Sequence, residues 1–395
     1  MRILLCNYEY PPLGGGGGVV MAALATELAK RHDVTVLSSR VGDLPAEATE
    51  DGVRVLRVPV LFRRQLAVAN FPSMLAYLPS AWWRGTRLGR SRPFDLINTH
   101  FVVPTGPVGA ALARQFRVPN VLSVHGGDLY DPSKSMSPHR HALLRLAIAR
   151  LLTRADRVVG QSRDTVGHVE SIYRVRRPVD LIPLGIVRPV PPTVATRASL
   201  GIPDDAFVMV SVGRVVARKA APQLVDVLAR SGRANAYLLI VGDGPERAAV
   251  AHRAAELGVA DRVRLLGQTS EEDKNRALAV SDVFVSTSQH EGFGLVFVEA
   301  MAFGLPIVCY DRGGQTDFLA TPASGAVVAL NDLEAFVRAV LELEASRERR
   351  VAAGRHNVAA ARGLFIDRCA AQYEALFERV LAERGVAATA GAQRS

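Results

Sequence analysis

Two glutamates lie eight positions apart in a segment whose pattern predicts a strand, a glycine-rich turn and a helix. The segment runs from Ser286 to Pro306 and places Glu291 on the turn and Glu299 on the helix. The helix is apolar nearly all round, which is typical of a buried helix. A carboxylate inside such a helix is costly unless it meets hydrogen-bond donors. Sugar or ribose hydroxyls would supply those donors, and an ion pair with a neighbouring arginine is the alternative.

Two cations follow another predicted strand, Phe207–Val212. Arg214 comes just after this strand, and Lys219 lies in the loop before the next helix. At the carboxyl end of a parallel sheet, a guanidinium and an ammonium together can hold a diphosphate. The free N–H groups at the start of the helix that follows Glu291 also favour an anion. Two solvated basic residues are the alternative, but the chain has only four lysines, which favours a role for Lys219.

The first half of the chain carries strand-end histidines and a glycine run. His125 follows a predicted strand and precedes two glycines, so it is a better functional candidate than His100, which fits a structural histidine. Five glycines, Gly14–Gly18, separate the first predicted strand from the first helix and would let backbone N–H groups approach a phosphate. A plain loop is the alternative. The nucleotide-hydrolase P-loop is excluded because no Gly-Lys-Ser/Thr follows. The second strand ends in Ser39 and Arg40 without an acidic residue to hold a ribose, which disfavours NAD, although Ser39 and Arg40 could tolerate NADP.

Nothing in the sequence demands a metal ion. There is no Asp-x-Asp motif, and the acidic run Glu271–Asp273 follows Ser270, which indicates first-turn acids on a capped helix. Three widely spaced cysteines exclude a disulfide framework and a zinc ribbon, and they fit a reducing cytosol.

Positive charge is concentrated in one part of the chain. The 395 residues carry a formal net charge of +10, and residues 54–177 alone hold 20 basic and 6 acidic side chains, a net +14. Such a field attracts phosphates, anionic lipids or nucleic acid, with a solvated basic face as the plain alternative. Because no recognised nucleic-acid-binding module is present, we expect no nucleic-acid partner.

An aromatic and basic stretch, Leu61–Arg92, lies within this region. Its composition suits either docking on an anionic membrane or a surface helix with buried aromatics. Its members are Trp82, Trp83, Arg63, Arg64, Arg84, Arg87 and Arg90. No run of about 18 uncharged apolar residues exists, so we expect no membrane span. Two prolines at 11 and 12 leave no room for a signal-peptide core.

The elements that must position these residues alternate between strand and helix. One series of short β-branched runs extends from Ile3–Cys6 to Leu181–Ile182, and a second extends from Phe207–Val212 to Ala326–Val328. Helical patterns lie between the strands, which predicts an α/β fold with two doubly wound parallel-sheet, Rossmann-like domains facing a cleft. Ligands in such folds bind at the carboxyl ends of the strands. A proline-rich linker separates the two series.

Taken together, these motifs resemble the GT-B-fold retaining glycosyltransferases of family four along almost the whole chain. They are Pro-Pro-x-x-Gly-Gly at the glycine run, His-Gly at His125, Ile-Pro-x-Gly at Ile182–Gly185, Gly-Arg-x-x-x-x-Lys ending at Lys219, Val-Gly-Asp-Gly-Pro at Val241–Pro245, and Glu-Gly-Phe-Gly-Leu at Glu291–Leu295 with Glu299 beyond it. The last is the family's hallmark and is highly specific.

The resemblance implies a set of site residues. The catalytic group would be His125, Glu291, Arg214 and Lys219. The donor would be bound by Gly16, Gly17, Arg214, Lys219, Leu266, Glu291, Gly292, Phe293, Gly294, Leu295 and Glu299, with Arg214 and Lys219 on the diphosphate and Glu299 on the ribose. His100 and Asp128 are weaker expectations for the acceptor, and no metal or cofactor is expected beyond the nucleoside diphosphate sugar as co-substrate.

The resemblance also implies the domain boundaries. They are an acceptor-binding domain at 1–184, a linker at 185–203, a donor-binding domain at 204–365, a helix crossing back to the first domain at 366–385, and a disordered tail at 386–395.

The expected activity is transfer of a hexose from a nucleoside diphosphate sugar to an acceptor hydroxyl with retention of configuration. A sugar-nucleotide epimerase of the same fold, an NADP-dependent oxidoreductase and a non-catalytic sugar-nucleotide-binding protein are the alternatives. The basic first domain weakly favours an anionic or lipid-linked acceptor. We expect a cytoplasmic protein, with peripheral contact at the inner face of the membrane left open. The base, the sugar, the acceptor and the oligomeric state are not specified by the sequence.

Overall fold

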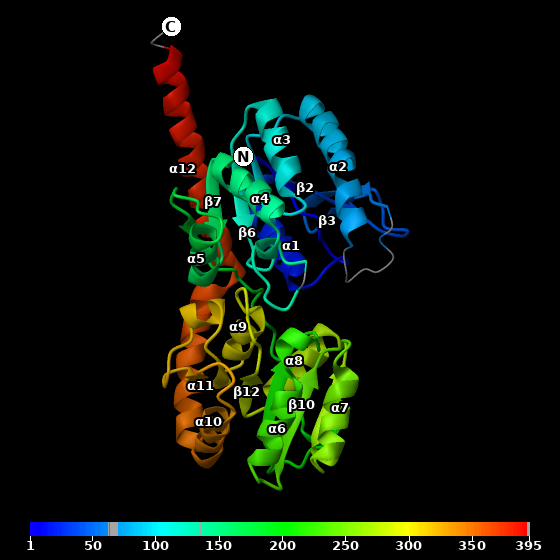
Figure 1. The fold of residues 1–395 in the computed structure, drawn as a ribbon, viewed down its shortest axis with the longest axis vertical. Helices are drawn as coiled ribbons and strands as arrows, with labels where there is room; N and C mark the ends of the chain where they lie inside the picture. Colours follow the sequence, from blue (N-terminus) through cyan, green and yellow to red (C-terminus); the bar gives the residue numbers. More distant parts are fainter. Residues whose placement is uncertain (62, 64–69, 135, 393–395) are drawn as a thin grey trace. The chain divides into compact units, whose positions relative to one another are not determined.

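The computed structural model describes residues 1–61, 63, 70–134 and 136–392, and its contacts divide the chain into two units (Figure 1). Unit 1 comprises Met1–Val187 together with Phe365–Ser395, and unit 2 comprises Arg188–Leu364. Within the basic stretch, Arg64 lies outside the described residues. Of the expected linker 185–203, residues 188–203 belong to unit 2, where the Arg197 guanidinium donates to the carbonyl oxygens of Val280 and Ala206.

Unit 1 is built on an eight-stranded sheet. Its strands are β1 (Arg2–Cys6), β2 (Asp33–Arg40), β3 (Glu47–Glu50), β4 (Val53–Pro59), β5 (Leu96–His100), β6 (Asn120–Val124), β7 (Arg157–Gly160) and β8 (Asp180–Leu181). Their order in the sheet is β3-β4-β2-β1-β5-β6-β7-β8, and every pairing is parallel except that of β3 with β4. The central strands are buried on both faces, which explains their continuous apolar sequences.

The helices of unit 1 cover this sheet. They are α1 (Gly16–Ala29), α2 (Phe71–Ser91), α3 (Gly106–Phe116), α4 (Ala142–Arg154), α5 (Arg163–Ser171) and α12 (Ile366–Ala392). On one face of the sheet, Tyr77 and Ala81 of α2 and Leu112 of α3 pack with strand residues such as Leu56 and Ile97 in one apolar cluster.

Unit 2 is built on a six-stranded parallel sheet. Its strands are β9 (Phe207–Val212), β10 (Ala236–Val241), β11 (Val263–Gly267), β12 (Val283–Ser286), β13 (Ile307–Tyr310) and β14 (Gly325–Val328), in the order β11-β10-β9-β12-β13-β14. Its helices are α6 (Pro222–Arg230), α7 (Arg247–Glu256), α8 (Glu271–Ala279), α9 (Leu295–Ala302), α10 (Leu333–Ala345) and α11 (Arg347–Ala361). Both units are therefore doubly wound α/β domains, as the sequence predicts.

Each sheet has one point at which the strand order reverses. In unit 1 this point lies between β1 and β5, and in unit 2 it lies between β9 and β12. Loops leave in opposite directions on the two sides of such a point and open a crevice at the carboxyl ends of the strands, where ligands of doubly wound folds bind. The candidate residues in both units follow these strands or their neighbours.

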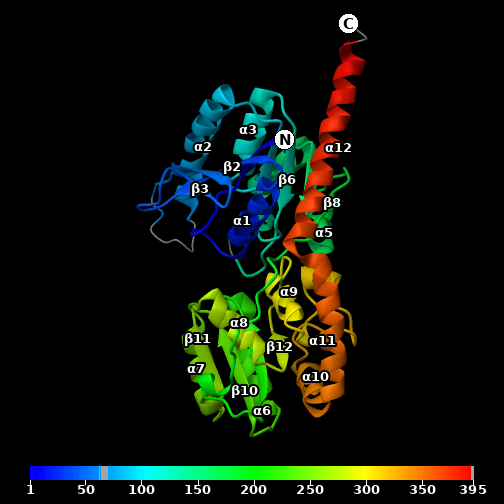
Figure 2. The same cartoon turned by 180° about the vertical axis from the view of Figure 1, so that it is seen from behind.

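The C-terminal helix α12 returns to unit 1, as Figure 2 shows from behind. Gly185 lies under its first turn, where an added Cβ would come within 2.7 Å of the Cα of Ile366. Glu374 of α12 accepts hydrogen bonds from Arg31 at 2.9 Å and from His32 at 2.7 Å. Tyr373 and Phe377 are fully buried, so residues far apart in sequence complete the core of unit 1.

Two helix boundaries and one strand differ from the sequence expectation. Helix α1 begins at Gly16, so three of the five glycines lie in its first turn rather than in a loop. Close packing explains them: a Cβ on Gly17 would lie 2.7 Å from Cζ of Phe101, and one on Gly18 would lie 3.0 Å from the carbonyl oxygen of Leu13. Helix α12 continues to Ala392, past the predicted end at 385; residues 393–395 lie outside the described part. The short antiparallel edge strand β3 has no apolar alternation and escaped prediction.

The acidic run at the start of α8 is confirmed as the first turn of a capped helix. The Ser270 hydroxyl accepts a hydrogen bond from the N–H of Asp273 at 3.1 Å. Among the described residues, no helix is long and apolar enough to cross a membrane.

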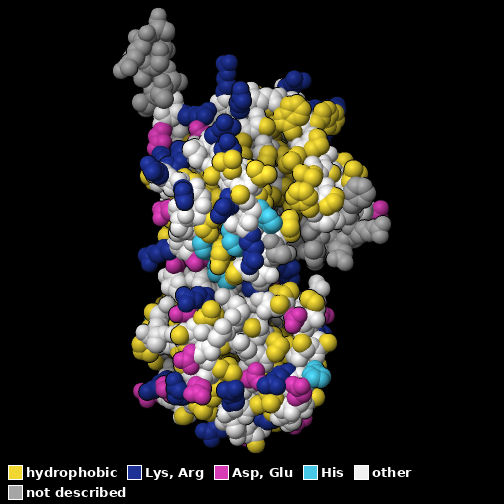
Figure 3. Space-filling view, viewed as in Figure 1, with side chains coloured by type: hydrophobic (Ala, Val, Ile, Leu, Met, Phe, Trp, Pro, Cys, Tyr) yellow, Lys and Arg dark blue, Asp and Glu magenta, His cyan; other side chains and the backbone are white. Residues whose placement is uncertain are grey.

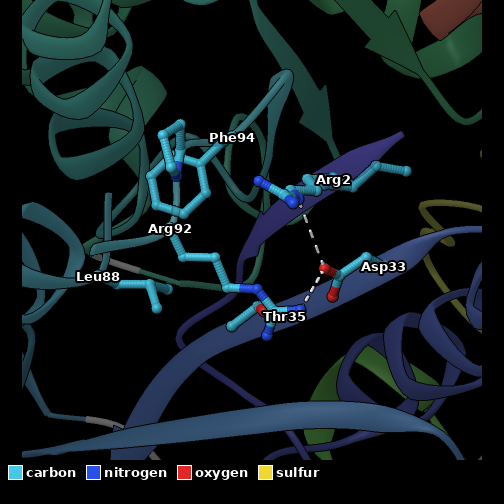
Figure 4. A pocket seen from close by; sticks show the side chains of 8 residues that line it. Arg2, Asp33, Thr35, Leu88, Arg92 and Phe94 are labelled. Carbon is cyan, nitrogen blue, oxygen red and sulfur yellow. Dashed lines mark hydrogen bonds and ion pairs between the residues drawn. The ribbon is translucent and has the colours of Figure 1, made fainter. Parts of the chain in front are cut away.

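A small pocket lies at the amino-terminal edge of the unit 1 sheet, away from the candidate residues (Figure 4). Asp33 closes it by accepting a hydrogen bond from Arg92 at 2.8 Å, with Nε of Arg2 3.9 Å away. Because its charges are already paired, this pocket is structural.

Candidate functional site

Glu291 in unit 2 is fixed by its backbone. It follows β12 and pairs with the turn after β13: its N–H donates to the carbonyl of Arg312 at 3.2 Å, and its carbonyl accepts from Gly314 at 2.9 Å. Gly313 makes this pairing feasible, because a Cβ there would lie 2.0 Å from the carbonyl oxygen of Glu291. The glutamate side chain is thereby held at the strand-order reversal beside β9.

Two cations from the loop after β9 meet the Glu291 carboxylate. Lys219 Nζ forms an ion pair with Oε1, and Arg218 Nη1 lies 3.4 Å from Oε2. The Glu291 side chain is only 8% exposed. Burial disfavours its ionisation, but the two cations outweigh this effect and hold the pKa of Glu291 at about 2. Glu291 is therefore ionised at neutral pH and anchors Lys219 in place.

Glu299, on α9, keeps one carboxylate oxygen without a partner. Lys274 of α8 donates to Oε1 at 3.0 Å, whereas Oε2 is buried and makes no hydrogen bond with any described residue. Burial raises the pKa of Glu299, and Lys274 opposes this only in part. An unpaired buried carboxylate oxygen is costly, and a hydroxyl donor would relieve that cost. The sequence left open hydroxyls or an arginine as partners; the structure supplies a lysine and leaves one oxygen available.

The remaining expected donor residues surround the same end of the sheet. Arg214 is exposed, and its guanidinium has no hydrogen-bond partner among the described residues. Leu266 is the extra residue of a bulge, because Leu265 and Gly267 pair with consecutive residues of β10; bulges redirect side chains near sites. Gly294 caps α9 with φ of 93°, a conformation suited to glycine. At the start of this helix the N–H groups of Leu295 and Val296 lack intrahelical partners, whereas that of Phe297 donates to the carbonyl of Gly294 at 3.0 Å.

In unit 1, His125 belongs to a buried polar group. His125 Nε2 lies 3.1 Å from Nδ1 of His100, and His125 Nδ1 lies 3.2 Å from Oε1 of Gln161. The ring of Phe101 packs over His125 with centroids 4.3 Å apart. Burial lowers the pKa of His125 to about 4, against a smaller opposing effect of the Gln161 contact, so the imidazole is neutral at pH 7.

The two residues expected at the acceptor have partners inside unit 1. His100 is buried, with its two ring nitrogens against Asn98 and His125. Asp128 accepts from the N–H groups of Val102 at 2.7 Å and His125 at 2.9 Å. Both side chains therefore hold the His125 loop, and their expected contact with the acceptor stays a prediction. Burial raises the pKa of Asp128 to about 6, and these hydrogen bonds only partly offset the rise.

The expected glycines Gly16 and Gly17 lie in the first turn of α1, which follows β1 at the reversal point of unit 1. Their N–H groups have no intrahelical partners, as in any first turn. Gly14 packs against Glu9, where an added Cβ would lie 2.4 Å from the carboxylate Oε2. A carboxylate thus lies beside the loop whose N–H groups were expected to approach a phosphate.

Sequence reasoning missed three residues that shape the two groups: Arg218, Lys274 and Gln161. For Lys274 a clue existed, because the scarcity of lysine that favoured Lys219 applies to it equally. Arg218 is one of 44 arginines and has no such distinction. Gln161 follows β7 directly, a position that marks the carboxyl end of a strand.

Comparison with known proteins agrees with this geometry. The model described as Glycosyltransferase Family 4 matches residues 14–187, and the one described as Glycosyl transferases group 1 matches residues 194–357. The chain is 30% identical over 357 residues to the 2-deoxystreptamine N-acetyl-D-glucosaminyltransferase of Streptomyces fradiae, covering 85% of this chain and 84% of that protein.

Solved structures share the fold. Sucrose-phosphate synthase from Thermosynechococcus elongatus aligns with a TM-score of 0.83 at 24% identity over 97% of this chain and 100% of that one. Anabaena HepE, solved in complex with UDP and glucose, aligns with a TM-score of 0.78 at 19% identity over 96% and 100% of the two chains.

Two doubly wound units with polar residues at the strand-order reversals are the structural class called GT-B. Within that class, the chain belongs to the glycosyl transferases group 1, family 4. It is a glycosyltransferase, and enzymes of this group typically use nucleotide sugars.

Proposed function

We propose that this protein transfers a hexose from a nucleoside diphosphate sugar to an acceptor hydroxyl with retention of configuration and without a metal ion. The observation that carries the proposal is the buried, unpartnered Oε2 of Glu299 on α9, the helix that follows β12, which is the neighbour of β9 in the sheet. A ribose hydroxyl donates to that oxygen. Arg214 and Lys219 take the diphosphate, and Glu291 takes hydroxyls of the transferred sugar.

Charge placement in unit 2 explains how the reaction would be accelerated. The transition state of glycosyl transfer resembles an oxocarbenium ion, and negative charge grows on the departing diphosphate. Cations and helix-start N–H groups that are already in place stabilise that charge without reorganisation. Glu291 keeps Lys219 oriented before the donor arrives, so little order has to be imposed during the reaction. The acceptor hydroxyl then attacks on the face from which the diphosphate leaves.

The ribose assignment is tested by comparing nucleoside diphosphates with their 2′,3′-dideoxy analogues in binding to wild type and to Glu299→Gln. The wild type should prefer the ribose form by about tenfold, since unpaired buried polar groups penalise a ligand without the hydroxyls. Glu299→Gln should bind the ribose form more weakly and lose much of this preference. Lys30→Gln, an exposed lysine on unit 1, serves as control. Equal binding of both forms by the wild type would refute the ribose role of Glu299.

Retention is tested on the product. The anomeric configuration of the glycoside, read by proton NMR, should match that of the donor sugar. An inverted product would contradict the proposed stereochemistry while leaving the transferase class intact.

We also propose that α2 attaches the protein peripherally to an anionic membrane, on the cytoplasmic side. Figure 3 shows hydrophobic side chains gathered over α2, and four of its large apolar side chains are more than two-fifths exposed: Phe71, Leu75, Trp82 and Trp83. Arginines border them, and Arg87 packs over the Trp83 ring at 5.7 Å. Exposed aromatics beside arginines suit the interface of anionic lipids.

The two tryptophans are the only ones in the chain, so they report on this attachment directly. Vesicles with anionic lipid should shift the tryptophan emission to the blue and sediment the protein, and added salt should reverse both effects. Trp82→Ser/Trp83→Ser should not sediment, whereas Val351→Ser, an exposed apolar residue of unit 2, should behave as wild type. Equal binding to purely zwitterionic vesicles would contradict the anionic surface.

A further inference from the structure

A chain of hydrogen bonds runs through the carboxyl ends of three neighbouring strands of unit 1. It joins Asn98 on β5, His100 at the end of β5, His125 after β6 and Gln161 after β7. All four side chains are at most 8% exposed. Because each ring nitrogen either donates or accepts, the protons in such a chain constrain one another.

Asn98 sets the direction of the chain. Its Nδ2 lies 3.0 Å from the carbonyl oxygen of Val121 and 3.1 Å from Oγ of Ser123. A backbone carbonyl oxygen can only accept, so the amide nitrogen must face it, and the orientation of the Asn98 side chain is unambiguous. Asn98 Oδ1 therefore accepts, and the ring nitrogen of His100 that lies 2.6 Å away, Nε2, must carry a proton.

The proton on Nε2 of His100 determines the proton position on the ring of His125. Burial and the neighbouring His125 hold the pKa of His100 well below its usual value, so His100 is neutral and has a single ring proton. With that proton on Nε2, His100 Nδ1 is a bare acceptor. Its partner 3.1 Å away, Nε2 of His125, must donate. A neutral His125 then has a bare Nδ1, which needs a donor.

Gln161 can be that donor. The atom at 3.2 Å from His125 Nδ1 is assigned as the amide oxygen, but amide oxygen and nitrogen exchange by a half-turn of the terminal torsion and are assigned from the surrounding network. Two bare acceptors cannot bond to each other. The network is therefore consistent only when the Gln161 NH2 group faces Nδ1, or when His125 carries a second proton, which its burial disfavours.

We propose that Asn98 and His100 are positioning residues that lock His125 as the neutral tautomer protonated on Nε2, so that it forms an uncharged wall of the site rather than an acid or base. The inference rests on the proposed function and on the catalytic role that the sequence resemblance implies for His125. Both ring nitrogens are occupied inside unit 1, so neither is available to transfer a proton to substrate. A charged imidazolium there would repel the positive charge that develops on the sugar in an oxocarbenium-like transition state.

The titratable groups that surround the ring fit this assignment. His100 faces it from β5, Tyr373 of α12 packs against His100 with ring centroids 5.9 Å apart, and Asp128 lies in the loop of His125 itself. The Asp128 carboxylate bonds the backbone of the loop rather than the imidazole. Tyr373 OH donates to Ser123 Oγ at 3.0 Å, so helix α12 steadies the hydroxyl that orients Asn98.

The first experiment reads the tautomers in the unliganded protein. Histidine labelled with ¹⁵N distinguishes protonated from bare ring nitrogens by NMR, and loss of resonances in His100→Asn and His125→Asn assigns them. At pH 7 both His100 and His125 should be protonated on Nε2 only. A proton on Nδ1 of His125, alone or in addition, would overturn the proposal, and this reading does not depend on knowing the substrate.

The second experiment separates positioning from packing at Gln161. In Gln161→Glu the carboxylate cannot donate, so a proton should move onto His125 Nδ1 and produce an imidazolium that the NMR detects. The kcat at pH 7 should fall about tenfold and recover as pH rises through the new pKa of His125. Gln161→Met, of similar size and uncharged, should keep His125 neutral and show no such pH-dependent recovery. Matching pH profiles of the two variants would contradict the proposal.

Asn98→Leu removes the acceptor that fixes the proton on Nε2 of His100, so His100 and His125 should each become a mixture of the two neutral tautomers. The kcat should fall by a larger factor than KM changes. Tyr77→Phe removes another buried tyrosine hydrogen bond of unit 1, to the carbonyl of Leu37 at 3.1 Å, and should leave both tautomers and kcat unchanged. Expected tautomers in a wild-type protein without transferase activity would refute the proposed function alone. An active wild type with His125 in another state would refute this inference alone.

Discussion

At the scale of single residues, the donor side of the site depends on the buried negative charge of Glu291, which two cations stabilise. Glu291 is 8% exposed, and Lys219 and Arg218 approach its two oxygens. Removing one partner of a buried ion pair destabilises the fold strongly, because the other charge stays buried without compensation. Replacing both partners can leave the stability nearly unchanged. The pair therefore has a stability role and a functional role, and these can be separated.

The acid dependence of stability should report the ionised state of Glu291. Its pKa is about 2 in the folded protein against an ordinary 4.5, so the pair contributes stability above pH 4.5 that is lost as pH falls toward 2. The full contribution is about 3 kcal/mol. In urea titrations, the difference in unfolding free energy between wild type and Glu291→Gln should shrink between pH 5 and pH 3. Glu299, whose pKa is raised, is present in both proteins and cancels. A difference that stays constant with pH would contradict the depressed pKa.

The functional role of Lys219 is separated by a double change. Lys219→Met should lower stability by up to about 3–5 kcal/mol, because Glu291 then keeps only Arg218. Adding Glu291→Gln should restore most of the stability, measured by urea unfolding. Turnover should stay about 10²–10³-fold low in both proteins, as when a charge-stabilising donor is lost. Recovery of turnover together with stability would mean that Lys219 is only structural.

At the scale of elements, the turn between β12 and α9 positions both glutamates. Gly294 has φ of 93°, and an added Cβ would lie 2.5 Å from Cδ2 of Phe297. Gly232, after α6, has φ of 65° with open space around it. Gly232→Ala should cost about 1–2 kcal/mol for backbone strain alone, and Gly294→Ala should cost more because of the contact. Only Gly294→Ala should abolish the thermal shift caused by a nucleoside diphosphate; an equal loss in both variants would contradict the role of this turn.

The strands were the most predictable elements. Phe207–Val212 matches the expected range, because buried parallel strands are short β-branched runs between turn residues. The start of α1 was not predictable, because glycine has low helix propensity and only the packing of Phe101 explains its use there. Strand β3 was missed because its sequence, Glu-Ala-Thr-Glu, has no buried face to reveal it.

The site was predictable to the level of motifs but not of pairings. Glu291, Glu299 and Lys219 were named from the sequence, yet the contacts of Glu291 with Lys219 and of Glu299 with Lys274 depend on which strands are neighbours in the sheet. Spacing along the chain gives no direct measure of that order. The same limit applies to His100: its place at the end of a strand is visible in the sequence, and its contact with Asn98 is not.

At the scale of the whole molecule, unit 1 is discontinuous in sequence and unit 2 is inserted within it. Calorimetry should therefore resolve two transitions, each sensitive to its own core. Phe377 near the C-terminus and Phe336 in unit 2 are both fully buried. Phe377→Ala should lower the free energy of unfolding of unit 1 by about 3–5 kcal/mol, and Phe336→Ala should lower that of unit 2 by a similar amount. Each change should therefore move the transition of its own unit to lower temperature. If Phe377→Ala lowered the same transition as Phe336→Ala, α12 would not belong to unit 1.

Because the two units should unfold in separate transitions, calorimetry can show whether a nucleotide binds to unit 2. The thermal unfolding of the wild-type protein is followed with UDP, GDP, ADP, TDP and NADP, each with and without magnesium. A ligand at about 100 times its Kd adds roughly 2.7 kcal/mol to the stability of the state that binds it. The account predicts that one nucleoside diphosphate, without magnesium, raises the transition that Phe336→Ala lowers. Stabilisation by NADP alone, or by a diphosphate only when magnesium is present, would contradict it.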